Sequence, residues 1–217
     1  MVSENNEDIQ MMINTGKPTI SGVVLFGFLF SSYIWAADFN EMIENCNACH
    51  GKDGASTESD IPIIGGLSPQ YIIDSLVAYK AKDRPCTEVK FISGANKGKA
   101  SDMCAVSKDL AESDIDQLAE HYAGKPFVRA QQTFDPKLAA TGKDLHERHC
   151  DKCHTEGGSL PDDDSGILAG QWMPYLKTSL EEYISGKRPT PEKMKPKIEK
   201  LEQADLDALV NYYGSFK

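Results

Sequence analysis

The feature that most constrains this chain of 217 residues is a pentapeptide of the form Cys-x-x-Cys-His that occurs twice. The copies are Cys46-Asn-Ala-Cys49-His50 and Cys150-Asp-Lys-Cys153-His154. They superimpose when the chain is aligned with itself at a shift of 104 positions, and the match continues without a gap through Arg84 and Arg188 to Pro85 and Pro189. A repeat of this length indicates two related structural units in tandem.

The register of the repeat changes after the two arginines. At a shift of 91 positions, Met103 aligns with Met194 and Leu118 aligns with Leu209. The first copy therefore contains 13 additional residues, all between Pro85 and Met103.

Each copy predicts three short helices. One helix carries the cysteine pair, one lies near 69–82 or 174–185, and the last lies near 112–122 or 203–213. Leucines and tyrosines that recur near helical spacing are expected to be buried: Leu110, Leu118, Tyr122, Leu201, Leu209 and Tyr213. Strand signals are scarce, so we expect an all-α protein with domains at 37–128 and 129–217, each small enough for a bound macrocycle to replace part of the core.

The repeated pentapeptide predicts covalent haem. Two thiols one helical turn apart can both add to the vinyl groups of one porphyrin, and the adjacent imidazole can bind its iron. The aligned methionines supply the second axial ligand, because histidine and methionine are the axial pair of cytochromes c. We therefore expect two haem c groups, attached through Cys46, Cys49, Cys150 and Cys153, with the irons held by His50, Met103, His154 and Met194.

Other uses of the cysteines fit the sequence less well. A structural zinc site needs four ligands, and each copy offers only two cysteines and one histidine before a long stretch without ligands. A thioredoxin-like pair requires a βαβ context that the sequence lacks. Met173 competes with Met194 as a ligand, but it aligns with Pro69 rather than with the methionine of the first copy.

Smaller expectations concern the surroundings of the two haems. The carbonyl of Pro62, and in the second copy that of Gly166, is placed to accept a hydrogen bond from the ligand imidazole and so fix its orientation. Arg84 and Arg188 either pair with haem carboxylates or end their helices as surface charges. The sequence leaves both alternatives open.

Cys86 and Cys104 lie at the two edges of the insertion, and Cys104 directly follows Met103. In an exported protein they are expected to form a disulfide that contributes about 3 kcal/mol and holds the Met103 loop against the iron. Two unpaired buried thiols are the alternative.

The N-terminal segment predicts export. Residues 18–37 carry no charge, Lys17 precedes them, and Ala36-Ala37 offers a cleavage point, so residues 1–36 are expected to be a signal peptide for the periplasm. A retained membrane anchor is the alternative. Without residues 1–36 the chain has 22 basic and 30 acidic residues, which argues against nucleic acid and favours a basic protein partner.

From Ala37 to the end, the sequence resembles the two-domain dihaem class I cytochromes c. Its second half, in FDPKLAATGKDLHERHCDKCHTEGG, ILAGQWMPYL and KRPTPEKMKPKI, is similar to the cytochrome subunit of flavocytochrome c sulfide dehydrogenase. The resemblance implies two haem domains related by a pseudo-twofold axis, with a flavoprotein as a possible partner. The insertion in the first half departs from that subunit.

Two filled axial positions leave no open iron site, so the sequence predicts no catalytic residue and no small-molecule substrate. The expected function is one-electron transfer between a donor and a terminal oxidase or reductase. The alternative is the electron-accepting subunit of a flavin-dependent sulfide dehydrogenase. A third interpretation, a haem peroxidase, requires one methionine to be displaced.

Overall fold

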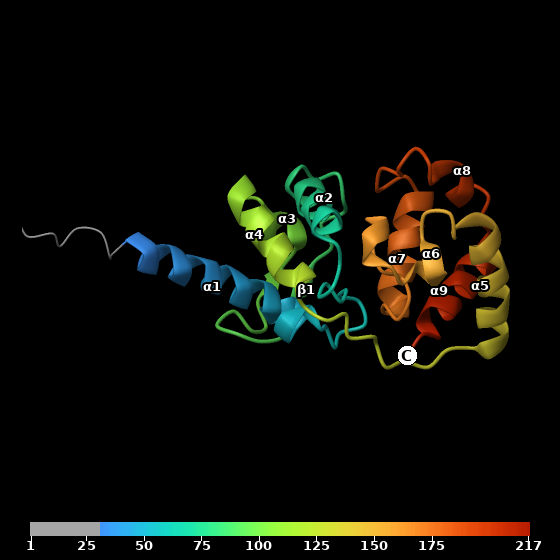
Figure 1. Cartoon of the computed structure of the whole chain (residues 1–217), viewed down its shortest axis with the longest axis horizontal. Coiled ribbons are helices and arrows are strands. Elements are labelled where there is room, and N and C mark those ends of the chain that lie inside the picture. Colours follow the sequence, from blue (N-terminus) through green and yellow to red (C-terminus); the bar gives the residue numbers. More distant parts are fainter. Residues whose placement is uncertain (1–30) are drawn as a thin grey trace, which may run out of the picture.

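The structure is a computed structural model that describes the chain from residue 31, with side chains from Asp38 onward. Most of the expected signal peptide therefore lies outside the described residues. Within the described part, no helix combines the length and apolar character needed to cross a membrane. Two helical units lie side by side, α1 to α4 in one and α5 to α9 in the other (Figure 1).

The first unit is built from four α-helices and a small hairpin. Its elements are α1 (Ser31–His50), η1 (Lys52–Gly54), α2 (Pro69–Lys80), β1 (Val89–Lys90), β2 (Ala100–Ser101), α3 (Met103–Ser107) and α4 (Glu112–Ala123). Asp114 in the first turn of α4 accepts a hydrogen bond from the Ala111 amide at 2.8 Å, which fixes the start of the helix. The core of the unit contains Leu118 and Tyr122, as the sequence predicts, with Leu110 packed against it.

The second unit repeats this plan without the hairpin. Its elements are α5 (Pro136–His149), α6 (Thr155–Gly158), η2 (Pro161–Asp163), α7 (Met173–Ile184), α8 (Lys195–Ile198) and α9 (Gln203–Gly214). Leu209 and Tyr213 lie in its core and Leu201 packs against them, again as predicted. The all-α prediction is confirmed, since the described residues contain only two strands of two residues each.

The internal repeat is visible in the backbone hydrogen bonds. The Gly66 amide donates to the Tyr122 carbonyl at 2.8 Å, and the equivalent Gly170 amide donates to the Tyr213 carbonyl at 2.8 Å. These bonds tie the loop before α2 or α7 to the end of the last helix in each unit. The two copies therefore share a tertiary framework as well as a sequence pattern.

The additional residues of the first copy form the hairpin. Val89 pairs with Ser101 and Lys90 with Ala100 in an antiparallel register. In the loop between the two strands, the Ile92 amide donates to the Ala48 carbonyl at 2.9 Å. The insertion therefore folds back over the first Cys-x-x-Cys-His motif.

One sequence expectation on the helices is wrong. The first cysteine pair lies on α1, but α5 ends at His149, before the second pair. The amides of Cys150 and Asp151 both donate to the His146 carbonyl, at 2.8 and 3.0 Å, and this shared acceptor ends the helix. The second motif then forms a separate turn, in which the His154 amide donates to the Cys150 carbonyl at 3.0 Å.

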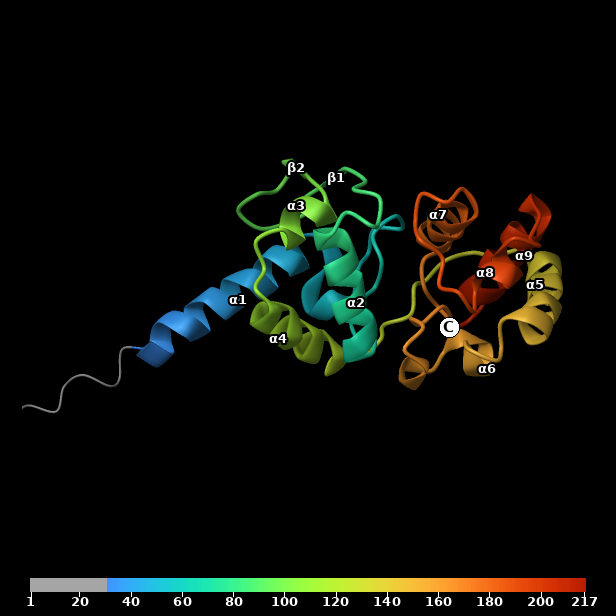
Figure 2. The same ribbon diagram turned by 90° about the horizontal axis from the view of Figure 1, so that it is seen from above.

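The two units lie next to each other in the view from above (Figure 2), and polar contacts join them along a seam. The buried side-chain amide of Gln171 donates to the Ile63 carbonyl and accepts from the Ile63 amide, both at 2.9 Å. The Trp172 indole donates to the Ser56 carbonyl at 3.0 Å. Ile167 of the second unit also packs into the core of the first.

Candidate haem-binding sites

The first motif presents a buried histidine with one ring nitrogen already occupied. His50 ends α1, is 7% exposed, and its Nδ1 lies 2.9 Å from the Pro62 carbonyl, which confirms the expected bond. Burial lowers the pKa of His50, so the imidazole is neutral near pH 7 and its Nε2 can bind a metal. Cys46 and Cys49 are free thiols, and burial raises the pKa of Cys46 to about 11.

The second motif is similar but less completely hydrogen-bonded. Cys150 and Cys153 are also free thiols. Burial, followed by the neighbouring His146, lowers the pKa of His154 to about 4, so this imidazole is neutral as well. Its buried Nδ1 has no hydrogen-bond partner among the described residues, so the expected bond to Gly166 is absent from this structure.

The two aligned methionines occupy similar places. Met103 begins α3, whose N-terminus is capped by Asp102 accepting from the Ala105 amide at 2.8 Å. Met194 immediately precedes α8. The rival Met173 packs with the second core and against Gly214, which assigns it a packing role.

Cys86 and Cys104 form the expected disulfide, with an S–S distance of 2.04 Å. Together with Asp102, they are the one group of potential metal ligands found among the described residues, and their sulfurs are bonded to each other. Neither Cys-x-x-Cys-His motif gathers further thiolate, imidazole or carboxylate ligands there, so the zinc alternative gains no support.

Two arginines are buried without a salt bridge. Arg84 and Arg188 are 5% and 9% exposed, neither forms a salt bridge within the described residues, and the Arg84 Nε has no hydrogen-bond partner there. Each guanidinium lies 4.3 Å from the ring centre of a tyrosine in its own unit, Tyr79 or Tyr183. The charge of Glu182 acts on both arginines but forms no salt bridge with either in the described part of the chain. Buried charge is costly without a close counter-ion, and the carboxylate groups of a haem would supply one. The residues present therefore fit haem.

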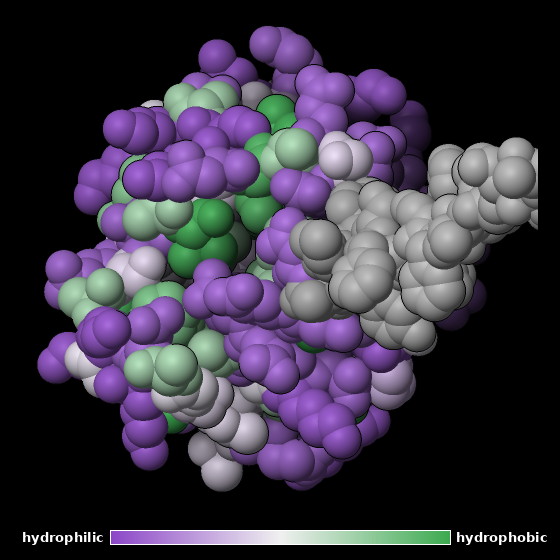
Figure 3. Space-filling model, turned by 90° about the vertical axis from the view of Figure 1, so that its left-hand side faces the viewer, coloured by the Kyte–Doolittle hydropathy of each residue, from purple (hydrophilic) through white to green (hydrophobic). Residues whose placement is uncertain are grey.

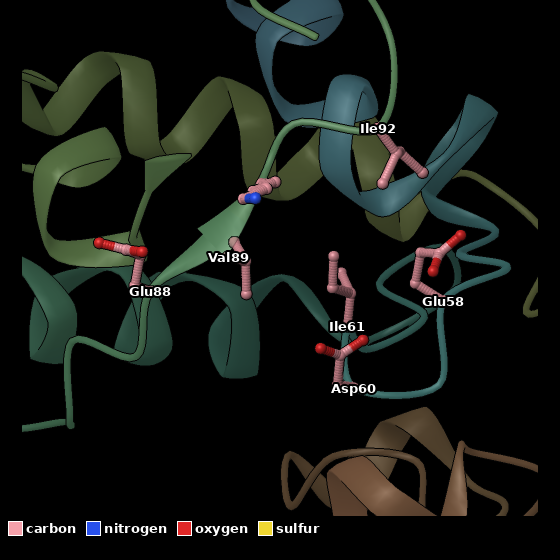
Figure 4. Close-up of a pocket in the computed structure, with 7 residues that line it drawn as sticks. Glu58, Asp60, Ile61, Glu88, Val89 and Ile92 are labelled. Atoms are coloured by element: carbon pink, nitrogen blue, oxygen red, sulfur yellow. The ribbon is translucent and has the colours of Figure 1, made fainter. Parts of the chain in front are cut away.

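An open cavity of about 340 Å³ lies beside the first motif (Figure 4). Ile61, Val89 and Ile92 line it, and the acidic side chains at its edge are Glu58, Asp60 and Glu88. On the outer face of the same unit, apolar side chains gather in a hollow within a mainly hydrophilic surface (Figure 3).

The repeat pattern alone does not indicate the roles of Tyr71 and Tyr175. These tyrosines occupy equivalent positions of the repeat in the two units, and the charges of both buried arginines, Arg84 and Arg188, act to lower the pKa of each of them. The repeat alignment marks all four residues, but it cannot reveal that their charges act on one another across the seam.

Comparisons with known proteins agree with this geometry. Residues 137–212 match the family model described as cytochrome C oxidase, cbb3-type, subunit III. Cytochrome c4 of Stutzerimonas stutzeri is 27% identical over 183 residues, covering 77% of this chain and 82% of that protein, and cytochrome c4 of Azotobacter vinelandii is 26% identical over 188 residues with the same coverage. At 77% coverage, these similarities extend into both halves of the chain. The chain is a two-domain dihaem cytochrome c.

Solved structures share the fold of this cytochrome. Reduced cytochrome c4 from Pseudomonas stutzeri superimposes with a TM-score of 0.66 at 23% identity, over 84% of this chain and 98% of that one. Thiosulfate dehydrogenase from Marichromatium purpuratum superimposes with a TM-score of 0.62 at 22% identity, over 78% of this chain and 36% of that one. The cytochrome is an electron carrier, and its relatives favour this function over that of a sulfide dehydrogenase subunit.

Proposed function

We propose that the chain is a periplasmic carrier in which His50 and Met103 bind one haem iron and His154 and Met194 bind the other. The observation that carries this proposal is the pair of neutral imidazoles, the buried His50 and the half-buried His154, each next to two free thiols. Haem attached through these cysteines supplies reversible one-electron exchange at iron. The protein positions the axial ligands and excludes other ligands from both irons.

The two domains offer differently charged surfaces to redox partners. Three acidic side chains, Glu58, Asp60 and Glu88, and one basic side chain, Lys90, border the cavity beside the first motif. The segment around Met194 is basic, because Lys187, Lys193, Lys195, Lys197 and Lys200 outnumber its acidic residues Glu192 and Glu199. Opposite fields speed encounter, so a basic partner would favour the first domain and an acidic partner the second. A donor and a terminal oxidase or reductase would then exchange electrons at opposite ends of the molecule.

Export supports the covalent chemistry. The uncharged stretch at 18–37 and the Cys86–Cys104 disulfide both suit an oxidising compartment. We expect cleavage after residue 36, giving domains at 37–128 and 129–217. Intact-mass measurement of protein from its native host tests the cleavage, and a retained N-terminus would indicate an anchored form instead.

The deciding experiment counts and identifies the haems. A pyridine haemochrome assay should give two covalent haems per chain, with no flavin in the purified sample. The weak far-red band of methionine-to-iron ligation should fall to about half of its intensity in each of the single variants Met103→Ala and Met194→Ala. It should be lost in the double variant. Stoichiometric flavin would favour the dehydrogenase subunit. A band that survives the double variant would overturn the axial assignment.

A further inference from the structure

The additional residues of the first domain lie against its Cys-x-x-Cys-His motif, and the second domain lacks them. Ala48 stands between the two cysteines of the motif, and its carbonyl accepts from the amides of Ile92 and Ser93 at 2.9 and 3.1 Å. This carbonyl lies in the last turn of α1, where helical carbonyls have no partner within the helix. The insertion therefore completes the end of the helix that carries the first motif.

The insertion also reaches one of the two attachment thiols. The Ile92 amide interacts with the Cys49 thiol and opposes the rise that burial causes in the pKa of Cys49. A Cβ added to Gly94 would stand 3.5 Å from the Cβ of Ala48. The consecutive insertion residues 92–94 thus all lie against the motif.

The insertion is held in this place by contacts of its own. The Phe91 side chain is 8% exposed, which buries an aromatic anchor from the insertion in the first domain. The Phe91 amide donates to the Lys99 carbonyl at 3.1 Å, and the Phe91 carbonyl accepts from the Gly98 amide at 2.8 Å. The Cys86–Cys104 disulfide closes the base of the insertion. The segment over the motif is therefore a fixed hairpin.

The exposure of the two motifs differs accordingly. Ala48 is 5% exposed, whereas the equivalent residue of the second motif, Lys152, is exposed. Cys49 is half-buried, whereas its equivalent Cys153 is exposed. The second motif therefore faces solvent on the side that the insertion occupies in the first domain.

We propose that the disulfide-closed insertion between Cys86 and Cys104 covers the attachment edge of the first haem and leaves the second haem more open to redox partners. The inference rests on the proposed function, because it assigns one haem to each motif. Haem bonded to both cysteines of a motif has its attachment edge beside that motif, so residues that cover Ala48 and Cys49 also separate this edge from solvent. A partner of the first domain meets the insertion, and a partner of the second domain meets the haem edge.

The test measures the solvent access of each haem by NMR in the oxidised dihaem protein. A neutral gadolinium chelate speeds the relaxation of exposed protons, so it reports access without transferring electrons and without attraction to charged surfaces. Met103→His and Met194→His assign the two sets of haem methyl signals, because each variant changes the axial ligand of one iron. Relaxation of the second set should increase several-fold more than that of the first.

Two variants remove the cover to different extents. In one, residues 86–102 are replaced by the Thr-Pro-Glu-Lys segment found at 190–193, together with Cys104→Ser. The access of the first haem should then rise to that of the second. In the other, Ile92→Pro removes one of the two amides that hold the insertion to Ala48, and the access of the first haem should rise partway.

Ala95→Pro is the matched control for the second variant. It places the same residue in the insertion, but the Ala95 amide donates no hydrogen bond within the described residues. Ala95 is also the second residue of a turn in which the Lys97 amide donates to the Gly94 carbonyl at 3.2 Å, a position that suits proline. The control should leave the access of both haems unchanged.

The outcomes separate the proposal from its premise. Equal access of the two haems in the parent protein would overturn the proposal, as would a folded replacement variant whose first haem stays closed. If the replacement variant does not fold, equal access in Ile92→Pro and Ala95→Pro overturns it. A single set of haem methyl signals in the parent would instead contradict the proposed function.

Discussion

Gly142 of α5 lies directly against Ala208 of α9, so closely that a Cβ added to the glycine would stand 2.0 Å from the Ala208 carbonyl oxygen. The contact lies where the first and last helices of the second domain pack together. Only a residue without a side chain permits this approach. The close packing of α5 against α9 supports the turn that carries the second haem motif, because α5 ends immediately before that turn.

Gly142→Ala should destabilise the second domain by about 3 kcal/mol, since the clash is with backbone that cannot rotate away. Urea unfolding of the dihaem protein, followed through its haem absorbance, measures the change. Gly124→Ala is the matched control: its φ is -74° and its nearest neighbours lie at 3.5 and 3.7 Å, which leaves room for a methyl group. Equal midpoints for both variants would contradict the close packing.

Gln171→Leu should loosen the seam between the domains. The substitution leaves the amide and carbonyl of Ile63 buried without hydrogen-bond partners. Each unsatisfied group costs about 1–3 kcal/mol of stability. Calorimetry should then resolve two unfolding transitions where the parent shows one. Gln70→Leu, on the exposed surface of α2, is the control and should leave the single transition intact. A single transition in Gln171→Leu would show that the amide does not couple the domains.

Replacing both Cys86 and Cys104 by serine should cost about 3 kcal/mol in the first domain, because the disulfide closes a loop with a sequence separation of 18 residues. The effect should fall on the Met103 loop. On heating, about half of the far-red methionine band should disappear at a lower temperature than in the parent protein. Loss of the whole band in one step would argue against a local role.

The basic segment around Met194 should control encounter with anions. Lys193→Glu combined with Lys195→Glu should slow reaction of the reduced protein with ferricyanide several-fold and weaken the dependence of the rate on salt. The double variant Lys137→Glu and Lys143→Glu makes the same charge change on exposed positions of α5 and serves as the control. Equal rates for the two double variants would mean that electrons leave elsewhere.

The sequence by itself determined the chemistry and the repeat. Cys-x-x-Cys-His is a local motif whose groups are neighbours along the chain, so the haem prediction needed no tertiary structure. The buried leucines and tyrosines of the last helices followed from helical spacing, and the Cys86–Cys104 bridge from an export signal and two spare cysteines. Each of these inferences rests on residues close in sequence or on comparison of the two copies.

Only the tertiary structure decided how the copies meet. The early end of α5 depends on two amides sharing the His146 carbonyl, and the bond between Gln171 and Ile63 joins residues 108 positions apart. The contact between the Tyr71 ring and Gly166 of the other domain likewise depends on the docking of two folded units. Such contacts depend on the shapes of two complementary surfaces. Periodic patterns along the chain do not contain this information, because the residues in contact are far apart in sequence. The coupling between the domains is therefore visible only in the folded molecule.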